Sequence, residues 1–174
     1  VLDAIVGHFK DLPQLSAGEG VTKVAIVGRP NVGKSSLVNR LIGSDRVVVS
    51  DVEGTTRDAV LVPFAYNKKD YALVDTAGLR RQRSVEKESV EGYSVLRTLT
   101  AIEEADVVII VFDGSEECVT EQDVRIAGMV HEAGKPSVIV VNKWDKKSKS
   151  KEEFTKRLSI DLAFMSYFKV IFVS

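Results

Sequence analysis

The sequence predicts a three-layer α/β fold, in which a mostly parallel sheet with one antiparallel edge strand lies between helices. Two observations carry this prediction. Short apolar segments alternate with segments whose apolar residues recur at helical spacing, and this alternation is typical of a parallel sheet. In addition, the segments 107–112 and 137–141 are apolar without interruption, as strands are when a sheet buries both of their faces.

The expected elements follow one another from residue 24 onward. We expect strands at 24–27, 60–66, 71–75, 107–112, 137–141 and 170–173, and helices at about 33–42, 86–104, 120–133 and 154–165. The two strands within 60–75 form a predicted hairpin with its turn at Asn67–Asp70, which supplies the antiparallel edge strand. In the helix 86–104, the residues expected to face the sheet are Val90, Tyr93, Leu96, Leu99 and Ile102.

Length and charge are typical of a single globular domain. The 174 residues are close to the roughly 150 of one domain. A net charge of −1 gives no bulk positive field for nucleic acid, and no apolar run is long enough to span a bilayer. The single cysteine, Cys118, has no partner within the chain, which favours an idle thiol in a cytoplasmic protein.

The first 20 residues are organised differently from the rest. Residues 1–10 show helical apolar spacing, and Pro13, Gly18 and Gly20 then mark a linker. We therefore expect the alternating strands and helices of residues 21–174 to form the domain.

The segment Gly28–Ser35 matches the pattern G-x-x-x-x-G-K-S/T at every fixed position, between an apolar strand and an amphipathic helix. Glycines let backbone N–H groups turn toward a phosphate, and the helix N-terminus adds the positive end of its dipole. Lys34 supplies a charge for the β- and γ-phosphates, and Ser35 a hydroxyl for Mg²⁺, which prefers oxygen ligands. The alternative is a glycine-rich turn that binds nothing, which the flanking strand and helix disfavour.

The tetrapeptide Asn142–Asp145 points to guanine as the base. It follows a buried strand, and ligands of parallel sheets bind outside the carboxyl ends of the strands. Guanine presents two adjacent donors, N1–H and N2–H₂, and the carboxylate of Asp145 can accept from both, whereas adenine has an acceptor at N1. Asn142 would steady the loop, and the stem of Lys143 could cover the base. The alternative is a polar turn, which the position of the tetrapeptide after the strand disfavours.

Two further segments provide candidates for sensing a γ-phosphate. Asp75 lies at the end of the predicted strand, after Tyr71–Val74, so its carboxylate can hold a magnesium-bound water, and the N–H of Gly78 can reach the γ-phosphate. Thr56, within Gly54–Asp58, can reach Mg²⁺ only when a γ-phosphate is present, which is an order–disorder switch. Taken alone, Thr55 and Thr56 would be interpreted as plain turn or strand residues. The other motifs favour the functional interpretation.

With these motifs in this order, the chain resembles the TrmE–Era–Der group of P-loop GTPases, and most of all the second GTPase domain of the Der (EngA) family. The segments that carry the resemblance are Val24–Ser36, Gly54–Asp58, Asp75–Arg81 and Asn142–Asp145. The first three extend beyond the generic motifs and are therefore more specific.

The resemblance implies an organisation and a function. It implies a three-layer P-loop GTPase fold at 21–174 that stops at the fifth motif, so that the final helix is missing, after the tail of a preceding GTPase domain and a linker at 1–20. It implies a molecular switch that hydrolyses GTP to GDP and phosphate during assembly of the large ribosomal subunit. The implied partners are the large subunit or its rRNA, and a neighbouring GTPase domain and a KH-like domain of the same full-length chain, in the cytoplasm and without a membrane.

The resemblance also implies ligands and site residues. Mg²⁺ would be held by Ser35, Thr56 and Asp75, and K⁺ by Asn31, where K⁺ takes the place of an arginine finger. The implied catalytic residues are Lys34, Thr56, Gly78 and Asn31. The implied contacts to GTP or GDP are Gly28, Asn31, Val32, Gly33, Lys34, Ser35, Ser36, Asp75, Gly78, Asn142, Lys143, Asp145 and Ser174.

Three positions depart from the pattern of these families. Many GTPases orient the attacking water with a glutamine after the D-x-x-G motif, and this chain has Leu79 there. A backbone group, another residue or a partner must then orient the water. Glu53 stands where the family often has proline, and Ser174 ends the chain where the fifth motif would continue into alanine.

Leu79 and the end at Ser174 keep alternatives open. A module that senses GTP or GDP with negligible turnover is one alternative to a GTPase switch. The GTPase domain of a tRNA-modifying or Era-like protein is another, and a protein ATPase is the least supported.

Overall fold

The computed structural model describes residues 21–42, 48–49, 62–66, 68–74, 90–146 and 150–174. These residues form one seven-stranded sheet in the order β2-β3-β4-β1-β5-β6-β7. The strands are β1 (Thr22–Val27), β2 (Val48–Val49), β3 (Val62–Tyr66), β4 (Lys69–Leu73), β5 (Val107–Asp113), β6 (Ser137–Asn142) and β7 (Lys169–Phe172). Strand β3 runs antiparallel to β2 and β4, and all other neighbours pair in parallel.

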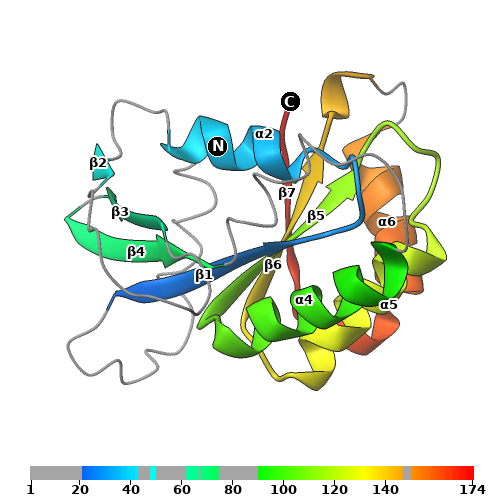
Figure 1. Cartoon of the computed structure of the whole chain (residues 1–174). Helices are drawn as coiled ribbons and strands as arrows, with labels where there is room; N and C mark the ends of the chain where they lie inside the picture. The colour runs from blue at the N-terminus through cyan, green and yellow to red at the C-terminus, as the bar shows by residue number, and fades with distance from the viewer. Residues whose placement is uncertain (1–20, 43–47, 50–61, 67, 75–89, 147–149) are drawn as a thin grey trace.

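Helices cover both faces of this sheet. They are α2 (Lys34–Ile42), α4 (Val90–Glu104), α5 (Glu121–Glu132) and α6 (Lys151–Asp161), with the 3₁₀ helices η1 (Trp144–Lys146) and η2 (Ala163–Met165). On one face, Leu37, Val38 and Leu41 of α2 pack into the apolar core. On the other face, α4, α5, α6 and η2 contribute to a second core. Figure 1 shows α2 on one side of the sheet and α4 and α5 on the other, so the predicted three layers are present.

The centre of the sheet is apolar because helices cover it on both sides. Every residue of β5 is buried, from Val107 to Asp113. Burying one such aliphatic side chain stabilises a fold by roughly 1.5–3 kcal/mol, so these strands fix the sheet as a rigid base. Asp113 is the charged exception, and it lies at the carboxyl end of the strand, next to the site described below.

The predicted hairpin is present, but its boundaries and its place differ from the prediction. Tyr66 pairs with Lys69, so β4 begins inside the predicted four-residue turn. Lys68 has a φ of 62°, the left-handed conformation that tight hairpin loops require. The predicted antiparallel strand is present as β3, and the two-residue strand β2 (Val48–Val49) pairs along its outer side, so β3 lies one strand in from the edge.

Two helix predictions need correction. Leu96 was expected to face the sheet, but it is 63% exposed. Steps of three residues drift around a helix that advances about 100° per residue, so Leu96 lies about 120° away from the fully buried Ile102. The helix predicted through Met165 also ends earlier, because Leu162 caps α6 and a separate 3₁₀ helix follows. Phe154, Leu158, Leu162 and Met165 are nevertheless all buried, as predicted.

Helix α5 begins with a cap that matters for the site. The Thr120 side chain accepts a hydrogen bond from the backbone N–H of Asp123, and the Asp123 carboxylate accepts one from the backbone N–H of Thr120. This reciprocal capping box satisfies two N–H groups that the first turn of a helix leaves without partners.

Several predictions lie outside the described residues. These are the helix and linker within 1–20, the switch segments Gly54–Asp58 and Asp75–Gly78 with Thr56, and Leu79. Among the helices that the structure describes, none is both long and apolar enough to cross a membrane.

Candidate functional site

The predicted phosphate loop lies over the middle of the sheet. Strand β1 ends at Val27, and the chain passes through Gly28–Gly33 before α2 begins at Lys34. Strand β1 lies between β4 and β5, and β5 pairs with β6. The carboxyl ends of the parallel strands β1, β5 and β6 therefore meet where parallel sheets bind ligands.

Two glycines are required by the close packing of this loop. Gly28 has a φ of 151°, and a Cβ there would lie 2.5 Å from the carbonyl oxygen of Val111. Gly33 has a φ of 99°, and a Cβ there would collide with the side-chain amide of Asn142. Asn31 also has a left-handed φ, of 65°, which asparagine tolerates better than most residues. The loop thus brings its backbone closer to β5 and β6 than side chains would allow.

Lys34 folds back over the loop. Its Nζ donates to the carbonyl oxygens of Gly28, at 2.8 Å, and Arg29, at 2.7 Å. Burial, with the nearby charge of Arg29, lowers the pKa of Lys34 to about 8, and the carboxylate of Asp123 partly opposes this shift. The ammonium group is thus held by neutral dipoles at a site that penalises its charge, and an anion bound there would relieve that penalty.

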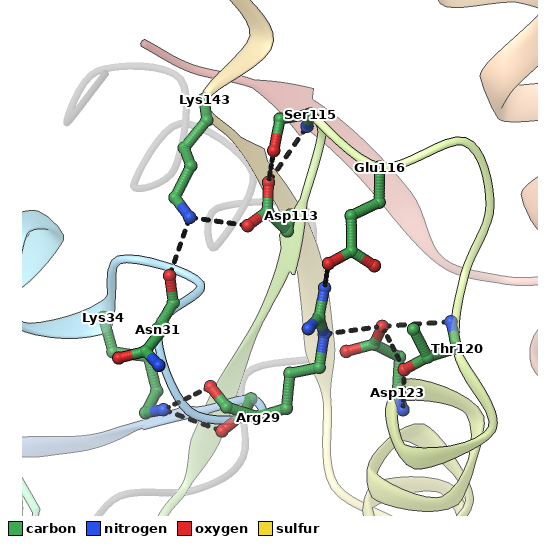
Figure 2. A network of polar contacts seen from close by, with 10 residues as sticks. Arg29, Asn31, Lys34, Asp113, Ser115, Glu116, Thr120, Asp123 and Lys143 are labelled. Carbon is green, nitrogen blue, oxygen red and sulfur yellow. Dashed lines mark hydrogen bonds and ion pairs between the residues drawn. The ribbon is translucent and has the colours of Figure 1, made fainter. Parts of the chain in front are cut away.

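The segment predicted to read the base is tied directly to the phosphate loop. Asn142 Nδ2 donates to the carbonyl of Val32 at 2.9 Å. Lys143 has a φ of 60°, and its Nζ donates to the carbonyl of Asn31 at 2.7 Å and to the carboxylate of Asp113 at 2.6 Å. Figure 2 shows Lys143 reaching from the end of β6 to both partners. The two predicted halves of the site therefore hold each other in place.

Asp145 lies just beyond this contact, on η1, and is exposed. Its neighbour Trp144 anchors the turn, because the indole packs edge-on against Phe154 and Phe172 at centroid distances of 5.5 and 4.5 Å. The backbone N–H of Trp144 also donates to the carbonyl of Val173 at 3.1 Å. The carboxylate of Asp145 is thus presented to the outside from a fixed turn.

The structure brings some of the predicted site residues together. Three sets of hydrogen bonds hold them: Lys34 donates to Gly28 and Arg29, Asn142 donates to Val32, and Lys143 donates to Asn31. The other predicted site residues that the structure describes are Gly33 within the loop, Ser35 half-buried and Ser36 exposed in the first turn of α2, Asp145 on η1, and Ser174 exposed after β7. Thr56, Asp75 and Gly78 lie outside the described residues.

Sequence reasoning missed a set of charged residues beside the loop. Arg29 Nη2 lies 2.5 Å from Glu116 Oε1, and Arg29 Nε lies 3.2 Å from Asp123 Oδ2. Burial lowers the pKa of Arg29, but the hydrogen bond to Glu116 and the charges of Asp123, Glu116 and Asp113 outweigh it and raise that pKa. The pattern Thr-x-x-Asp at 120–123 is a capping signal visible in the sequence, but its link to Arg29 is not.

Asp113 was missed as well. Burial would raise the pKa of its carboxyl, but hydrogen bonds from Lys143 and from the hydroxyl and N–H of Ser115 outweigh burial and lower it. The Ser115 contacts are 2.5 and 3.0 Å long. An acidic residue at the end of an otherwise apolar strand was the available signal.

The chain is similar to curated proteins named GTPase Der. It is 51% identical to GTPase Der of Lachnospira eligens and 49% identical to GTPase Der of Staphylococcus aureus, in both cases over 177 residues that cover 100% of this chain and 40% of the relative. The chain thus spans about two fifths of the length of these relatives. The resemblance to Der is thereby confirmed.

Solved structures and a family match agree with this similarity. A structure of Aquifex aeolicus Era bound to GDP·AlF4− has a TM-score of 0.60 and 28% identity, covering 87% of this chain and 51% of that chain. The elongation factor SelB of Methanococcus maripaludis, with a TM-score of 0.61 and 17% identity over 88% of this chain and 30% of that chain, shares the fold. Residues 23–143, well over half of the chain, match the family described as 50S ribosome-binding GTPase. The chain belongs to the 50S ribosome-binding GTPase family.

Proposed function

We propose that this chain binds GTP and hydrolyses it to GDP and phosphate, as a molecular switch in assembly of the large ribosomal subunit. The observation that carries the nucleotide part is the direct contact between the two predicted halves of the site. Asn142 and Lys143 bond to the carbonyls of Val32 and Asn31, so the base-reading turn and the phosphate loop are fixed relative to each other. A nucleotide needs this arrangement, because its base and its phosphates must be held at one separation.

Each half has a defined task in the proposed complex. Two of the three N–H donors of Lys34 stay on the carbonyls of Gly28 and Arg29, and the third is directed, with the charge, at the β- and γ-phosphates. Backbone N–H groups of the loop and of the first turn of α2 complete the phosphate cradle. Asp145 accepts hydrogen bonds from N1–H and N2–H₂ of guanine.

Replacing Asp145 by asparagine tests the base-reading role. Asp145→Asn presents one acceptor and one donor where guanine needs two acceptors, so GTP affinity should fall by about 100-fold or more. Xanthosine triphosphate, which has a carbonyl in place of N2–H₂, should gain affinity. Unchanged GTP affinity in a fluorescence titration would remove Asp145 from the base site.

Magnesium fits the residues present. Mg²⁺ binds through one or two protein oxygens together with substrate phosphates, and Ser35 at the start of α2 offers one hydroxyl beside the cradle. Among the described residues, no group of three or more His, Cys, Asp or Glu forms a metal site independent of a nucleotide. We propose Thr56 and Asp75 as the further magnesium residues. Bound Mg²⁺ would neutralise charge that develops between the β- and γ-phosphates. A solved structure of Era, 27% identical to this chain, contains a nucleotide with magnesium, MgGDPNP.

Potassium is a further proposed cofactor, held by Asn31. The asparagine is exposed at the tip of the loop with its backbone in the left-handed conformation, so its side-chain oxygen is accessible to a cation. Its backbone carbonyl is already used by Lys143. Single-turnover hydrolysis at equal ionic strength should be faster in KCl than in NaCl, and Asn31→Ala should remove the difference. Equal rates in both salts for the wild type would rule out the potassium role.

Single-turnover GTP hydrolysis distinguishes the switch enzyme from the alternative, a sensing module with negligible turnover. Leu79 carries no hydrogen-bonding side chain for a water, so Gly78, Thr56 or a partner is proposed to complete the site. We expect slow but measurable release of phosphate from γ-labelled GTP, and none in Lys34→Met. Tight GTP binding without phosphate release would favour the sensing module.

The ribosomal role and the wider domain organisation follow from the relatives. They are more than twice as long as this chain and carry the name Der, so residues 21–174 are proposed as one GTPase domain of a longer protein, with 1–20 as the tail of a preceding domain and a linker. The partners would then be the large subunit or its rRNA, a neighbouring GTPase domain and a KH-like domain, all in the cytoplasm. Co-sedimentation with large-subunit precursors in the GTP state, lost in GDP, would test this role.

A further inference from the structure

The charged residues beside the phosphate loop form one cluster, which we call the Arg29 clamp: Arg29, Glu116, Thr120 and Asp123. Arg29 extends from the loop to two carboxylates, those of Glu116 and Asp123. Figure 2 shows its guanidinium between them, pointing away from the side chain of Lys34. Arg29 is about 90 positions from Glu116 and Asp123 in the chain, so the clamp joins the phosphate loop to the start of α5.

The clamp is anchored on one buried carboxylate, that of Asp123. The side chain of Asp123 is 3% exposed and that of Arg29 18% exposed, whereas Glu116 is 39% exposed. Asp123 Oδ2 also accepts from the backbone N–H of Thr120, at 3.1 Å, and from its hydroxyl, at 2.8 Å. A carboxylate fixed by a helix cap is a rigid anchor, because its rotamer is already set by other bonds.

The clamp acts at the residue whose carbonyl holds Lys34. The carbonyl of Arg29 accepts from Lys34 Nζ at 2.7 Å, and the next residue is Pro30, whose ring restricts the backbone of Arg29. Arg29 is thus restrained by its side chain and by the proline that follows it. The planar guanidinium suits this task, since it can bond two carboxylates in one fixed geometry.

We propose that Arg29 is a positioning residue of the phosphate site, held by Asp123 and Glu116 so that its carbonyl keeps Lys34 in the cradle. Because two carboxylates occupy the guanidinium, Arg29 acts through Lys34 and the loop backbone rather than on phosphate itself. The inference rests on the proposed function, and it assigns to the segment between β5 and α5 the task of setting the geometry of the phosphate loop.

The test compares binding of GTP with binding of guanosine, which lacks phosphates. Arg29→Ala should weaken GTP binding about tenfold and leave guanosine binding unchanged, because only the phosphate half loses its geometry. Arg29→Lys should weaken GTP binding as well, since an ammonium cannot bond both carboxylates in the arginine geometry. Asp123→Asn should weaken GTP binding, and adding it to Arg29→Ala should cause little further loss, because the two residues act as a pair.

Two control variants separate positioning from general damage. Lys135→Met removes the ammonium that caps the carbonyls of Glu103 and Ala105 at the end of α4, outside the clamp, so it should lower the melting temperature without changing GTP affinity. Arg125→Ala removes an exposed arginine of α5 and should change neither quantity.

Three outcomes would overturn the proposal. These are an unchanged GTP affinity in Arg29→Ala, an equal loss of guanosine binding in that variant, and a loss of GTP affinity in Lys135→Met as large as that in Asp123→Asn. Failure of the wild-type chain to bind GTP would instead contradict the proposed function, so the two failures are distinguishable.

Discussion

Lys34 and Lys143 contact the same loop but are held in opposite ways. Lys34 donates to two carbonyls of the loop, whereas Lys143 donates to one carbonyl and to the carboxylate of Asp113. The carboxylate that acts on Lys34 from nearby, Asp123, is bonded to Arg29. Figure 2 shows both lysines around Asn31. A lysine whose charge is paired within the chain stabilises the fold, and one whose charge rests on dipoles alone is available to an incoming anion.

The pKa of Lys34 expresses this difference. Burial and the charge of Arg29 lower it to about 8, so the empty site penalises the charged form. Its folded pKa lies below the usual value of 10.5, so the unfolded chain binds more protons between about pH 8 and 10.5. The stability of the free chain should therefore rise with pH across that window. A polyphosphate would reverse the penalty, and the site thus favours a bound anion.

The largest expected effect is on ligand affinity, in Lys34→Met. GTP binding should weaken by about 100-fold, or about 2.7 kcal/mol, because charge-assisted hydrogen bonds to the phosphates are lost. The free energy of unfolding of the free chain should stay the same or increase, because a buried charge has been removed. Isothermal titration calorimetry and urea denaturation measure the two quantities. Parallel losses of stability and affinity would contradict the assignment of Lys34 to the ligand.

The second effect is on stability, in Lys143→Met. This variant leaves the buried carboxylate of Asp113 without its ammonium partner, and the lysine side chain is 29% exposed. We expect a loss of about 2 kcal/mol in the free energy of unfolding, below the cost for a fully buried pair because solvent screens part of the charge.

The carboxylate partner provides the control for Lys143. Combining Asp113→Asn with Lys143→Met should restore part of the lost stability, because no unpaired charge then remains. A Lys143→Met chain as stable as the wild type in urea would show that the pair is not a structural link.

The third effect is a pH dependence of affinity. GTP requires Lys34 protonated, and the groups that face this lysine are Arg29 and Asp123. Raising the pH from about 7.0 to 8.5 should lower GTP affinity about fourfold, since a group with a pKa of about 8 loses most of its proton across that range. Lys143→Met should keep this dependence and Lys34→Met should lose it. An affinity that does not change over the range in the wild type would contradict the lowered pKa.

The smallest effect is expected at a third lysine, Lys135, which lies at the C-terminal end of α4. Lys135 Nζ donates to the carbonyls of Glu103 and Ala105, at 2.9 and 2.8 Å, where it caps the helix. Lys135→Met should cost less than about 1 kcal/mol of stability and leave GTP affinity unchanged. This lysine also rests on two carbonyls, so an unchanged GTP affinity would show that such a contact alone does not identify a ligand-directed lysine. A loss of GTP affinity in Lys135→Met would contradict the view that the effect of Lys34→Met is specific to the phosphate site.

Local sequence patterns were sufficient to predict the fold and many residues of the candidate site. The parts that they did not predict depend on contacts between residues far apart in the chain. The positions of Gly28, Gly33 and Lys34 follow from spacing, because a phosphate loop needs small residues and a charge at fixed offsets. Leu96 was misplaced because steps of three residues do not keep to one face of a helix. The bond from Arg29 to Asp123 spans 94 positions, and neither residue has a local signal for the other. The edge pairing of Val48–Val49 was missed because two residues are too few for a periodic pattern.

The most direct test of the central claim, a guanine nucleotide site formed by the phosphate loop and the turn at Asn142–Asp145, is competition between nucleotides. Fluorescent GDP bound to the chain in the presence of Mg²⁺ would be displaced by increasing GTP or ATP. We predict that GTP displaces it at a concentration at least about 1,000-fold lower than ATP, because Asp145 would face a lone pair of adenine. Displacement by both nucleotides at similar concentrations would contradict the claim.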